Sequence, residues 1–549
     1  MLISLMRGML ASRLLMALGL MLAPALAVQA QEPAKATEGL APTKAEGAHE
    51  EKKEEAKPKP VTVKSPVAMQ VFQRNEDGFA DIPIVVDAEG TSETVRSVTL
   101  SGQNTQINVA YRDGKLLKVP AGGPYTITVV VADPNAPHPG ITGGVIQIPS
   151  VYVGDLWVLA GQSNMEGVGN LTDVTPPSDR VFALGMDGKW VKAEEPLHWL
   201  VDSPDPVHSG DPKDRAARSE AQHKTRVKGA GLGLPFAASL AAKTGIPIGL
   251  VITAHGGTSM AQWDPAKKGE GGNSLYGSMF RQLELAGGKV RGVLWYQGES
   301  DAMGDAYKIY PKVFADFIAA LRKDLGQPEL PFYFVQIGRF VHTSDPKGWN
   351  AVQDAQRLLP DRVPNTAVVA AIDLELDDLI HVGTPGLKRL GQRLSLIAQR
   401  ELFNDVGATT PTLDRVSKRA DHTLVLKFKG VNRAPGTPAG LNPQGGRIRG
   451  NVANPGAGLP ASNGGLKGLQ PARHIAGFSI RKEDGTEIPI IFDAGVGKSN
   501  DTVELKLVGD LPEKAFLWYG HGLNPYCNLT DALDMAVPVF GPIPLDEIK

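Results

Sequence analysis

The predicted fold rests on one stretch, Gly154-Asp155-Leu156-Trp157-Val158-Leu159-Ala160-Gly161-Gln162-Ser163-Asn164-Met165. Its apolar run is typical of a buried strand, and the run ends in a turn of small residues that contains one serine. A strand end followed by a glycine turn leaves backbone N–H groups unpaired and lifts the next side chain out of the sheet. We therefore expect Ser163 to stand beside free N–H donors at the end of a strand.

Strand-like and helix-like segments alternate through residues 151–404. The strand candidates are 151–159, 248–254, 292–296, 332–337 and 367–372, and the helix candidates are 234–243, 275–285, 307–325 and 349–358. This alternation predicts the α/β class, with a parallel sheet covered on both faces. Loops that follow parallel strands meet at one edge of the sheet, so Ser163, Gln297, Asp378 and His381 should converge there.

The flanking segments have a different pattern, of short alternating runs broken by turns. We predict five parts: a signal peptide (1–30), a disordered linker (31–65), a β-rich, sandwich-like N-terminal domain (66–150), the α/β domain (151–404) and a β-rich C-terminal domain (405–549). The Gly/Pro/Asn-rich stretch 430–472 is most simply a long surface loop, although such loops can also line a substrate groove.

The N-terminus has the three features of an export signal. Arg7 and Arg13 precede an apolar run at 14–22, and Val28-Gln29-Ala30 places small residues ahead of Gln31. The run is shorter than the roughly 20 residues that a spanning helix needs, so we expect cleavage and no stable membrane insertion. The mature protein should be periplasmic or extracellular. Cys527 is the single cysteine, which excludes an intrachain disulfide.

Composition narrows the range of partners. The formal net charge is −2, and no Lys/Arg stripe interleaved with aromatic residues appears, so nucleic acid is not an expected partner. The sequence has no HExxH helix and no clustered Cys/His set, so we expect neither a metal nor a cofactor.

The segment Asp378-Leu379-Ile380-His381 places a carboxylate three residues before a histidine. In a turn, this spacing lets the carboxylate accept the imidazole Nδ1–H and leaves Nε2 free as a base for Ser163. Ser163 alone is as easily a helix N-cap, and His381 alone a structural histidine. Asp377 is chemically equivalent to Asp378 and Asp373 is a more distant competitor, so spacing is the only ground for preferring Asp378.

Two further segments end predicted strands with residues that can stabilise an oxyanion. The glycines of His255-Gly256-Gly257-Thr258-Ser259 would let an N–H group approach a developing negative charge, although they equally permit a tight turn. In Trp295-Tyr296-Gln297-Gly298-Glu299-Ser300-Asp301, the Gln297 amide could point at the same charge, and Ser300 or Asp301 could cap the next helix.

Four ordered blocks resemble the sialate O-acetylesterase family of the SGNH/GDSL hydrolase superfamily: residues 161–165, residues 255–258 with Trp263, residues 295–301 and residues 378–381. The resemblance extends over about 66–545 and implies an SGNH-type three-layer α/β/α domain at 151–404. It implies Ser163 as nucleophile, His381 as general base and Asp378 as its orienting partner. It also implies an oxyanion hole made by the Ser163 and Gly257 N–H groups and the Gln297 side chain.

Two departures from the family pattern are visible. Family members often have a proline directly after the histidine, where this chain has Val382-Gly383. The segment 176–228 is rich in Asp, Pro, Arg and Lys and resembles an insertion that could be a lid or a specificity loop.

The expected function is an exported serine esterase that removes O-acetyl groups from carbohydrates, with an acetylated carbohydrate as its substrate. Two alternatives stay open at this point. One is a glycoside hydrolase that uses Glu299 and Asp301 as a carboxylate pair. The other is a non-catalytic carbohydrate-binding protein on a degenerate hydrolase scaffold. The sequence leaves open the sugar, the hydroxyl position, the oligomeric state and the roles of 176–228 and 430–472.

Overall fold

The structure is a computed structural model that describes residues 61–89, 94–102, 105–133, 144–403, 407–433, 441–443, 474–546 and 548. Contacts divide the chain into 1–57 and 58–549, and all of these residues belong to the second unit. The predicted signal peptide, most of the predicted linker and most of the 430–472 stretch lie outside the described residues. Among the helices that are described, none is both long and apolar enough to cross a membrane.

A central sheet carries the α/β part, with its strands in the order β13-β12-β15-β10-β16-β17-β18. The strands are β10 (Val145–Gly161), β12 (Val181–Leu184), β13 (Trp190–Lys192), β15 (Ile248–Ile252), β16 (Gly292–Tyr296), β17 (Phe332–Gln336) and β18 (Thr366–Ala370). All neighbours run parallel except β13, which pairs antiparallel with β12. The predicted α/β class is confirmed.

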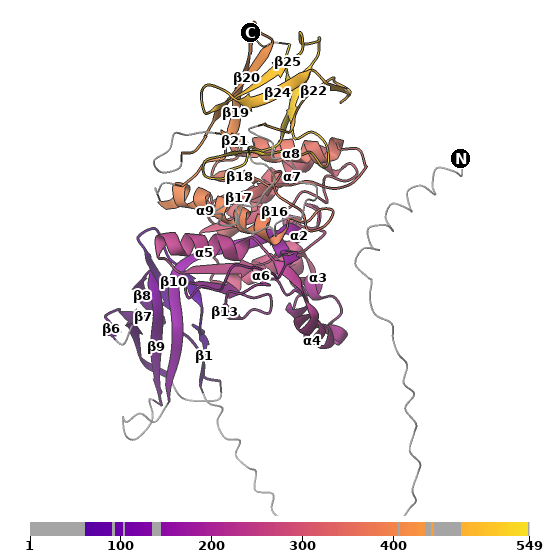
Figure 1. Cartoon of the computed structure of the whole chain (residues 1–549). Coiled ribbons are helices and arrows are strands. Elements are labelled where there is room, and N and C mark those ends of the chain that lie inside the picture. Colours follow the sequence, from indigo (N-terminus) through magenta and orange to yellow (C-terminus); the bar gives the residue numbers. More distant parts are fainter. Residues whose placement is uncertain are drawn as a thin grey trace, which may run out of the picture. The chain divides into compact units, whose positions relative to one another are not determined.

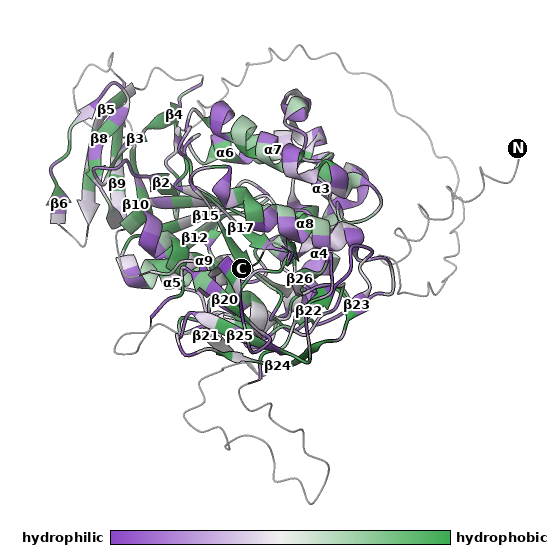
Figure 2. Cartoon of the chain, turned by 90° about the horizontal axis from the view of Figure 1, so that it is seen from above, coloured by the Kyte–Doolittle hydropathy of each residue, from purple (hydrophilic) through white to green (hydrophobic). Residues whose placement is uncertain are grey.

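Helices surround this sheet and lie between its strands in the chain. They are α2 (Ser163–Glu166), α3 (Pro206–Ser209), α4 (Arg215–Thr225), α5 (Gly233–Thr244), α6 (Leu275–Leu285), α7 (Tyr310–Leu325), α8 (Lys347–Leu358) and α9 (Thr384–Phe403). Short 3₁₀ helices are η1 (Leu200–Asp202), η2 (Pro212–Asp214), η3 (Pro265–Asn273), η4 (Ala306–Lys308) and η5 (Leu359–Asp361). In Figure 2, β12 and β17 are mostly hydrophobic, whereas α7 and α8 alternate hydrophobic and hydrophilic residues, as helices with one buried face do.

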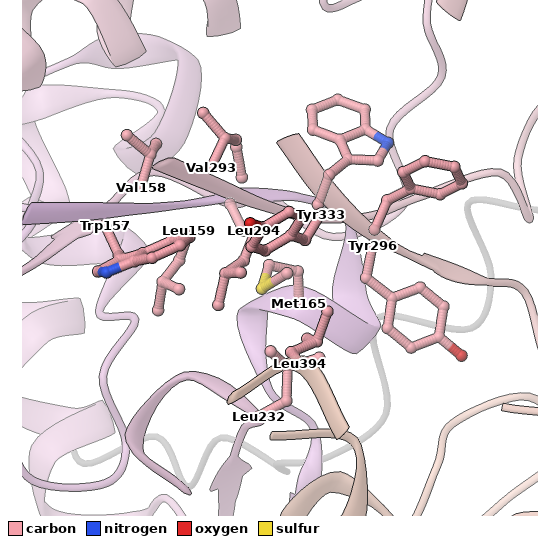
Figure 3. Packing of buried hydrophobic residues seen from close by; sticks show 14 of the residues in the cluster. Trp157, Val158, Leu159, Met165, Leu232, Val293, Leu294, Tyr296, Tyr333 and Leu394 are labelled. Atoms are coloured by element: carbon pink, nitrogen blue, oxygen red, sulfur yellow. The ribbon is translucent and has the colours of Figure 1, made fainter. Parts of the chain in front are cut away.

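Two buried tryptophans show how the sheet is covered. Trp157 on β10 pairs in register with Gly292, and Ala160 pairs with Trp295 on β16, so the two indoles project from opposite faces. Trp157 packs edge-on against Phe236 of α5, with ring centroids 4.8 Å apart. Trp295 packs against Phe317 of α7, also at 4.8 Å. Figure 3 shows Trp157 among the apolar side chains of this core.

β10 also connects the central sheet to the N-terminal strands. Its first half pairs with β9 and β2, and its second half pairs with β15 and β16. Figure 1 shows β10 running beside β9 from the N-terminal strands toward the central sheet. The N-terminal strands are β1 (Thr62–Ser65), β2 (Val71–Gln73), β3 (Phe79–Pro83), β4 (Val85–Asp87), β5 (Thr94–Gly102), β6 (Thr105–Ile107), β7 (Tyr111–Arg112), β8 (Lys115–Pro120) and β9 (Gly122–Ala132). The predicted boundary at 150/151 therefore lies inside a continuous strand.

The C-terminal part forms small antiparallel sheets with a separate apolar cluster. Its strands are β19 (Thr412–Arg419), β20 (Thr423–Lys429), β21 (Leu441–Pro443), β22 (Phe478–Arg481), β23 (Glu487–Ile488), β24 (Ile491–Val496), β25 (Thr502–Leu507), β26 (Phe516–Tyr519), β27 (Leu529–Asp531) and β28 (Phe540–Pro544). The predicted β-rich character is present, whereas the sandwich arrangement stays a prediction.

The segment 176–228, which resembles an insertion, also contributes to the central sheet. β12 and β13 lie inside it, and all four residues of β12 are buried beside β15. β14 (Lys228–Ala230) begins at its end and pairs with β11 (Gly169–Asn170). Part of the segment is therefore core structure and not a lid.

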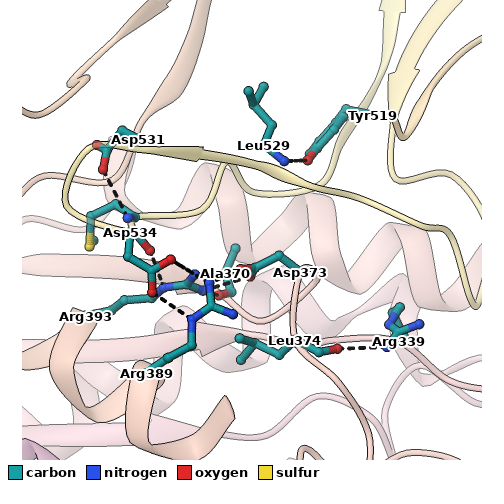
Figure 4. A network of polar contacts seen from close by, with 11 residues as sticks. Arg339, Ala370, Asp373, Leu374, Arg389, Arg393, Tyr519, Leu529, Asp531 and Asp534 are labelled. Carbon is teal, nitrogen blue, oxygen red and sulfur yellow. Dashed lines mark hydrogen bonds and ion pairs between the residues drawn. The ribbon is translucent and has the colours of Figure 1, made fainter. Parts of the chain in front are cut away.

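A buried ion network joins α9 to the C-terminal part. Asp373 accepts hydrogen bonds from Arg389 at 2.7 Å and from Arg393 at 2.8 and 2.7 Å. Arg389 also binds both carboxylate oxygens of Asp534, at 2.6 and 2.7 Å (Figure 4). Burial acts to raise the pKa of Asp373, but the two guanidinium groups outweigh it, so that the pKa lies below its ordinary value.

Asp373→Asn should lower the free energy of unfolding by about 3–5 kcal/mol at neutral pH, because it leaves the buried Arg393 and the partly buried Arg389 with one carboxylate. The pKa of Asp373 is depressed in the folded state, so its stabilisation is present above the unfolded pKa and is lost as the pH falls through the folded value. Urea denaturation as a function of pH measures both effects. Asp414→Asn is the matched control, since its ion pair with Arg415 is exposed and should contribute less than about 1 kcal/mol. Equal losses for the two variants would contradict this account.

Candidate active site

Ser163 begins α2 directly after the end of β10, and the backbone of Gly161 makes this turn possible. Gly161 has φ +133°, and a Cβ added there would lie 2.3 Å from the carbonyl oxygen of Tyr296. The N–H of Gln162 donates to that same carbonyl at 2.8 Å. A side chain at residue 161 would therefore force β10 and β16 apart where the serine leaves the sheet.

Ser163, His381 and Asp378 lie in one hydrogen-bonded line. Nε2 of His381 is 2.9 Å from Oγ of Ser163, and Nδ1 of His381 is 2.8 Å from Oδ2 of Asp378. A carboxylate can only accept, so Nδ1 carries the hydrogen, and Nε2 of the neutral ring is left as the acceptor for the serine hydroxyl. The structure thus brings Ser163 to Asp378 and His381, which lie more than 200 residues later in the sequence.

The turn at 378–381 explains the three-residue spacing. Oδ1 of Asp378 accepts the backbone N–H groups of Ile380 and His381, each at 2.9 Å, while Oδ2 faces the imidazole. Partial burial acts to raise the pKa of Asp378, but these amides and the His381 ring outweigh it and hold the pKa below its ordinary value. Asp378 is therefore ionised at neutral pH.

The two competing carboxylates are engaged elsewhere. Oδ2 of Asp377 accepts the backbone N–H of Asn170 at 3.2 Å and its side-chain N–H at 2.8 Å. Asp377 therefore ties the turn to β11, and Asp373 lies in the ion network with Arg389 and Arg393.

Asn164 also holds the histidine in place, a contribution that the sequence analysis did not assign. Its Oδ1 accepts the N–H of Val382 at 3.0 Å, and its Nδ2 donates to Oε1 of Glu299 at 2.8 Å. Burial raises the pKa of Glu299, and the bond from Asn164 partly opposes this rise. The residue after the serine therefore connects three separate loops.

The 255–258 loop lies against the serine. A Cβ added to Gly256 would be 3.4 Å from Cβ of Ser163, and the Gly256 N–H donates to Oε2 of Glu166 at 2.8 Å. Gly257 has φ +68° and open space around it. Within the described ranges, the backbone N–H groups of Ser163 and Gly257 have no hydrogen-bond partner.

Gln297 is fully buried, and its amide is already occupied. Nε2 donates to the carbonyl of Thr258 at 3.1 Å and to Oδ2 of Asp301 at 2.5 Å, which uses both of its hydrogens. In this arrangement Gln297 ties the end of β16 to the 255–258 loop. The oxyanion contact expected from the sequence would require one of these two bonds to break.

Glu299 and Asp301 are also enclosed, at 3% and 4% exposure. Asp301 accepts the N–H of Met260 at 2.9 Å in addition to the Gln297 bond. Both carboxylates are therefore enclosed and hydrogen-bonded to groups in the loops around Ser163. This arrangement does not favour their use as the carboxylate pair of a glycoside hydrolase. In the part of the chain that the structure describes, no group of three or more His, Cys, Asp or Glu side chains could hold a metal ion.

Comparisons with known proteins identify the family. A sequence profile described as "Carbohydrate esterase, sialic acid-specific acetylesterase" matches residues 153–400. A probable carbohydrate esterase of Arabidopsis thaliana is 30% identical over 284 residues, which cover 47% of this chain and 94% of that protein. The chain belongs to this family.

One solved structure supports the fold. A carbohydrate acetylesterase from Xanthomonas citri aligns with a TM-score of 0.56 and 22% identity, covering 86% of this chain and 97% of that chain. A solved Arabidopsis thaliana structure aligns with a TM-score of 0.36 and 28% identity, covering 45% of this chain and 98% of that one. Family membership makes this chain a carbohydrate esterase, and thus an ester hydrolase.

Asp378→Asn should reduce kcat for an aryl acetate by roughly 10³–10⁴, because an amide favours the wrong imidazole tautomer while preserving shape. Asp377→Asn should reduce kcat far less, because the new amide keeps an oxygen that can accept the Asn170 hydrogen bonds. Glu299→Gln should also reduce kcat less than Asp378→Asn does. Steady-state kinetics on the three purified variants, each checked for native circular dichroism, make the comparison. A larger loss in Asp377→Asn or Glu299→Gln would show that another carboxylate orients His381.

Proposed function

We propose that this chain is an exported serine esterase that removes O-acetyl groups from carbohydrates through an acetyl-serine intermediate. The observation that carries the proposal is the unbroken line from Asp378 through His381 to Ser163, with separations of 2.8 and 2.9 Å. Acyl transfer to a serine hydroxyl requires a nucleophile, a base and a carboxylate that orients the base. Membership of the carbohydrate esterase family supports an ester of a carbohydrate as the substrate.

In the first half-reaction, Oγ of Ser163 attacks the acetyl carbonyl carbon while Nε2 of His381 takes the hydroxyl proton. The imidazolium that forms is stabilised by the ionised Asp378. The C–O bond to the sugar then breaks, and His381 gives its proton to the departing sugar oxygen. In the second half-reaction, His381 activates a water molecule that attacks the acetyl-serine, and acetate leaves as Ser163 regains its proton.

The tetrahedral intermediates carry a negative oxygen that needs donors. We assign this role to the backbone N–H groups of Ser163 and Gly257, which have no other partner among the described residues. We assign Gln297 to positioning, because its hydrogens hold Thr258 and Asp301. Asn164 positions the base through its bond to Val382, directly after the histidine.

The sugar that carries the ester can be identified by measuring acetate release from a panel of acetylated carbohydrates, including O-acetylated sialic acid and acetylated xylan. Release of acetate without new reducing ends supports the esterase. Release of new reducing ends would support a glycoside hydrolase, and binding without either product would support a carbohydrate-binding protein.

Ser163→Ala should lower kcat by on the order of 10⁴ or more, because it removes the hydroxyl that His381 would activate. Ser259→Ala is a matched control in the loop after β15, since within the described residues the Ser259 hydroxyl makes a hydrogen bond to Gln262 alone. Aryl acetate hydrolysis and thermal unfolding are measured for both variants. Near-normal turnover by a folded Ser163→Ala variant would reduce Ser163 to a structural residue.

Export rests on the N-terminal sequence. Protein recovered from the periplasm or medium of an expressing bacterium should begin near Gln31, because the small residues at 28–30 form the cleavage site. N-terminal sequencing measures this directly. An intact Met1 on exported protein would contradict a cleavable signal.

A further inference from the structure

A second polar chain leads from the interior to the loop beside Ser163. Oγ of Ser278 on α6 donates to Oδ2 of Asp205 at 2.6 Å and lies 3.0 Å from Nε2 of His208 on α3. Nδ1 of His208 lies 2.9 Å from Nδ1 of His255, which follows β15. Asp205 and Ser278 are both 2% exposed. None of these four residues takes part in the mechanism proposed above.

The hydrogen on each atom of this chain follows from its partners. Asp205 is paired with Arg281, so its carboxylate can only accept, and Ser278 must donate its single hydrogen to it. The serine oxygen is then the acceptor for Nε2–H of His208. A neutral imidazole carries one hydrogen, so Nδ1 of His208 is bare and must accept Nδ1–H from His255. This leaves a bare Nε2 on His255.

The neutral form of both rings is supported by their surroundings. Burial lowers the pKa of His208 to about 3, with the neighbouring His255 adding to the effect. Burial also lowers the pKa of His255. Each ring therefore has one donor and one acceptor at neutral pH, as the Nδ1–Nδ1 contact demands.

His255 is fixed next to the nucleophile. Its backbone N–H donates to the carbonyl of Gly161 at 3.0 Å, two residues before Ser163, and the adjacent Gly256 lies against Ser163. Nε2 of His255 has no hydrogen-bond partner among the described residues, and this nitrogen is not fully enclosed by protein. An acceptor with a fixed tautomer is therefore carried by a residue whose backbone adjoins the nucleophile turn.

We propose that Nε2 of His255 accepts a hydrogen bond from a free hydroxyl of the sugar that bears the ester, and that Asp205, Ser278 and His208 are positioning residues that set this tautomer. This specificity role rests on the proposed esterase function. It identifies the substrate class as partially acetylated sugars with a free hydroxyl beside the acetylated one. Polar sites of this kind discriminate against analogues that lack the hydroxyl, because the acceptor is then left unpaired.

The test compares three esters: a monoacetylated glucose, which has free hydroxyls beside the acetyl group, glucose pentaacetate, which has none, and an aryl acetate. The wild-type enzyme should prefer the monoacetate. His255→Phe should lower kcat/KM for the monoacetate by on the order of 10–100-fold and leave the other two esters within about threefold. An equal fall for all three esters would make His255 structural and overturn the proposal, and so would an unchanged monoacetate rate.

Ser278→Ala keeps His255 and removes the hydroxyl that fixes the ring hydrogens. It should lower monoacetate turnover selectively, by less than His255→Phe does, while Ser259→Ala should leave the ratio of the esters unchanged. Loss of monoacetate preference in Ser259→Ala, or its full retention in Ser278→Ala, would contradict the assignment.

Nitrogen-15 NMR of histidine-labelled wild-type protein tests the tautomers without any substrate. His255 should show an unprotonated Nε2 and a protonated Nδ1, and His208 the reverse, with assignments made from the His255→Phe and His208→Phe variants. A protonated Nε2 on His255 would overturn the inference even in an active esterase. Absence of hydrolysis of every ester by the wild type would instead refute the proposed function, and the NMR result would still stand.

Discussion

The close approach of β10 and β16 at Gly161 is the constraint on which the site depends. With no side chain at 161, the carbonyl of Tyr296 can accept the N–H of Gln162 at 2.8 Å, so the two strands stay paired up to the residue before the serine. Ser163 therefore leaves the sheet from a fixed point. β15 and β16 flank β10, and this brings the loops after both strands to the same edge.

Buried polar side chains beneath that edge hold the loops in fixed positions. Asn164 joins the Glu299 carboxylate to the segment after His381, and Gln297 joins Asp301 to Thr258. Buried polar networks of this kind are rigid because every broken bond leaves an unpaired group out of water. The loops around Ser163 are also anchored in the apolar core, through buried residues such as Met165, Met260 and Val382.

Much of the architecture could be predicted because its signals are local. Buried strands such as β15 and β16 are short apolar runs, and α7 has apolar residues at helical spacing. α9 is not among the predicted helices, although Leu387, Leu390 and Leu394 recur at a spacing typical of a helix with one buried face. β12 is different: a four-residue run inside a polar segment becomes recognisable as a strand only when β15 pairs with it.

The sequence by itself determined the residue types of the site, because a Ser in a strand-to-helix turn and a D-x-x-H segment are local patterns. It could not separate Asp377 from Asp378, whose difference lies in their partners: Asn170 on β11 for one and the imidazole for the other. It could not show that the hydrogens of Gln297 are occupied, or that Asp205, Ser278 and His208 form a chain to His255. These facts belong to the tertiary structure, because a hydrogen bond depends on where the partner's lone pair or hydrogen lies in space, and residues far apart in sequence supply those partners.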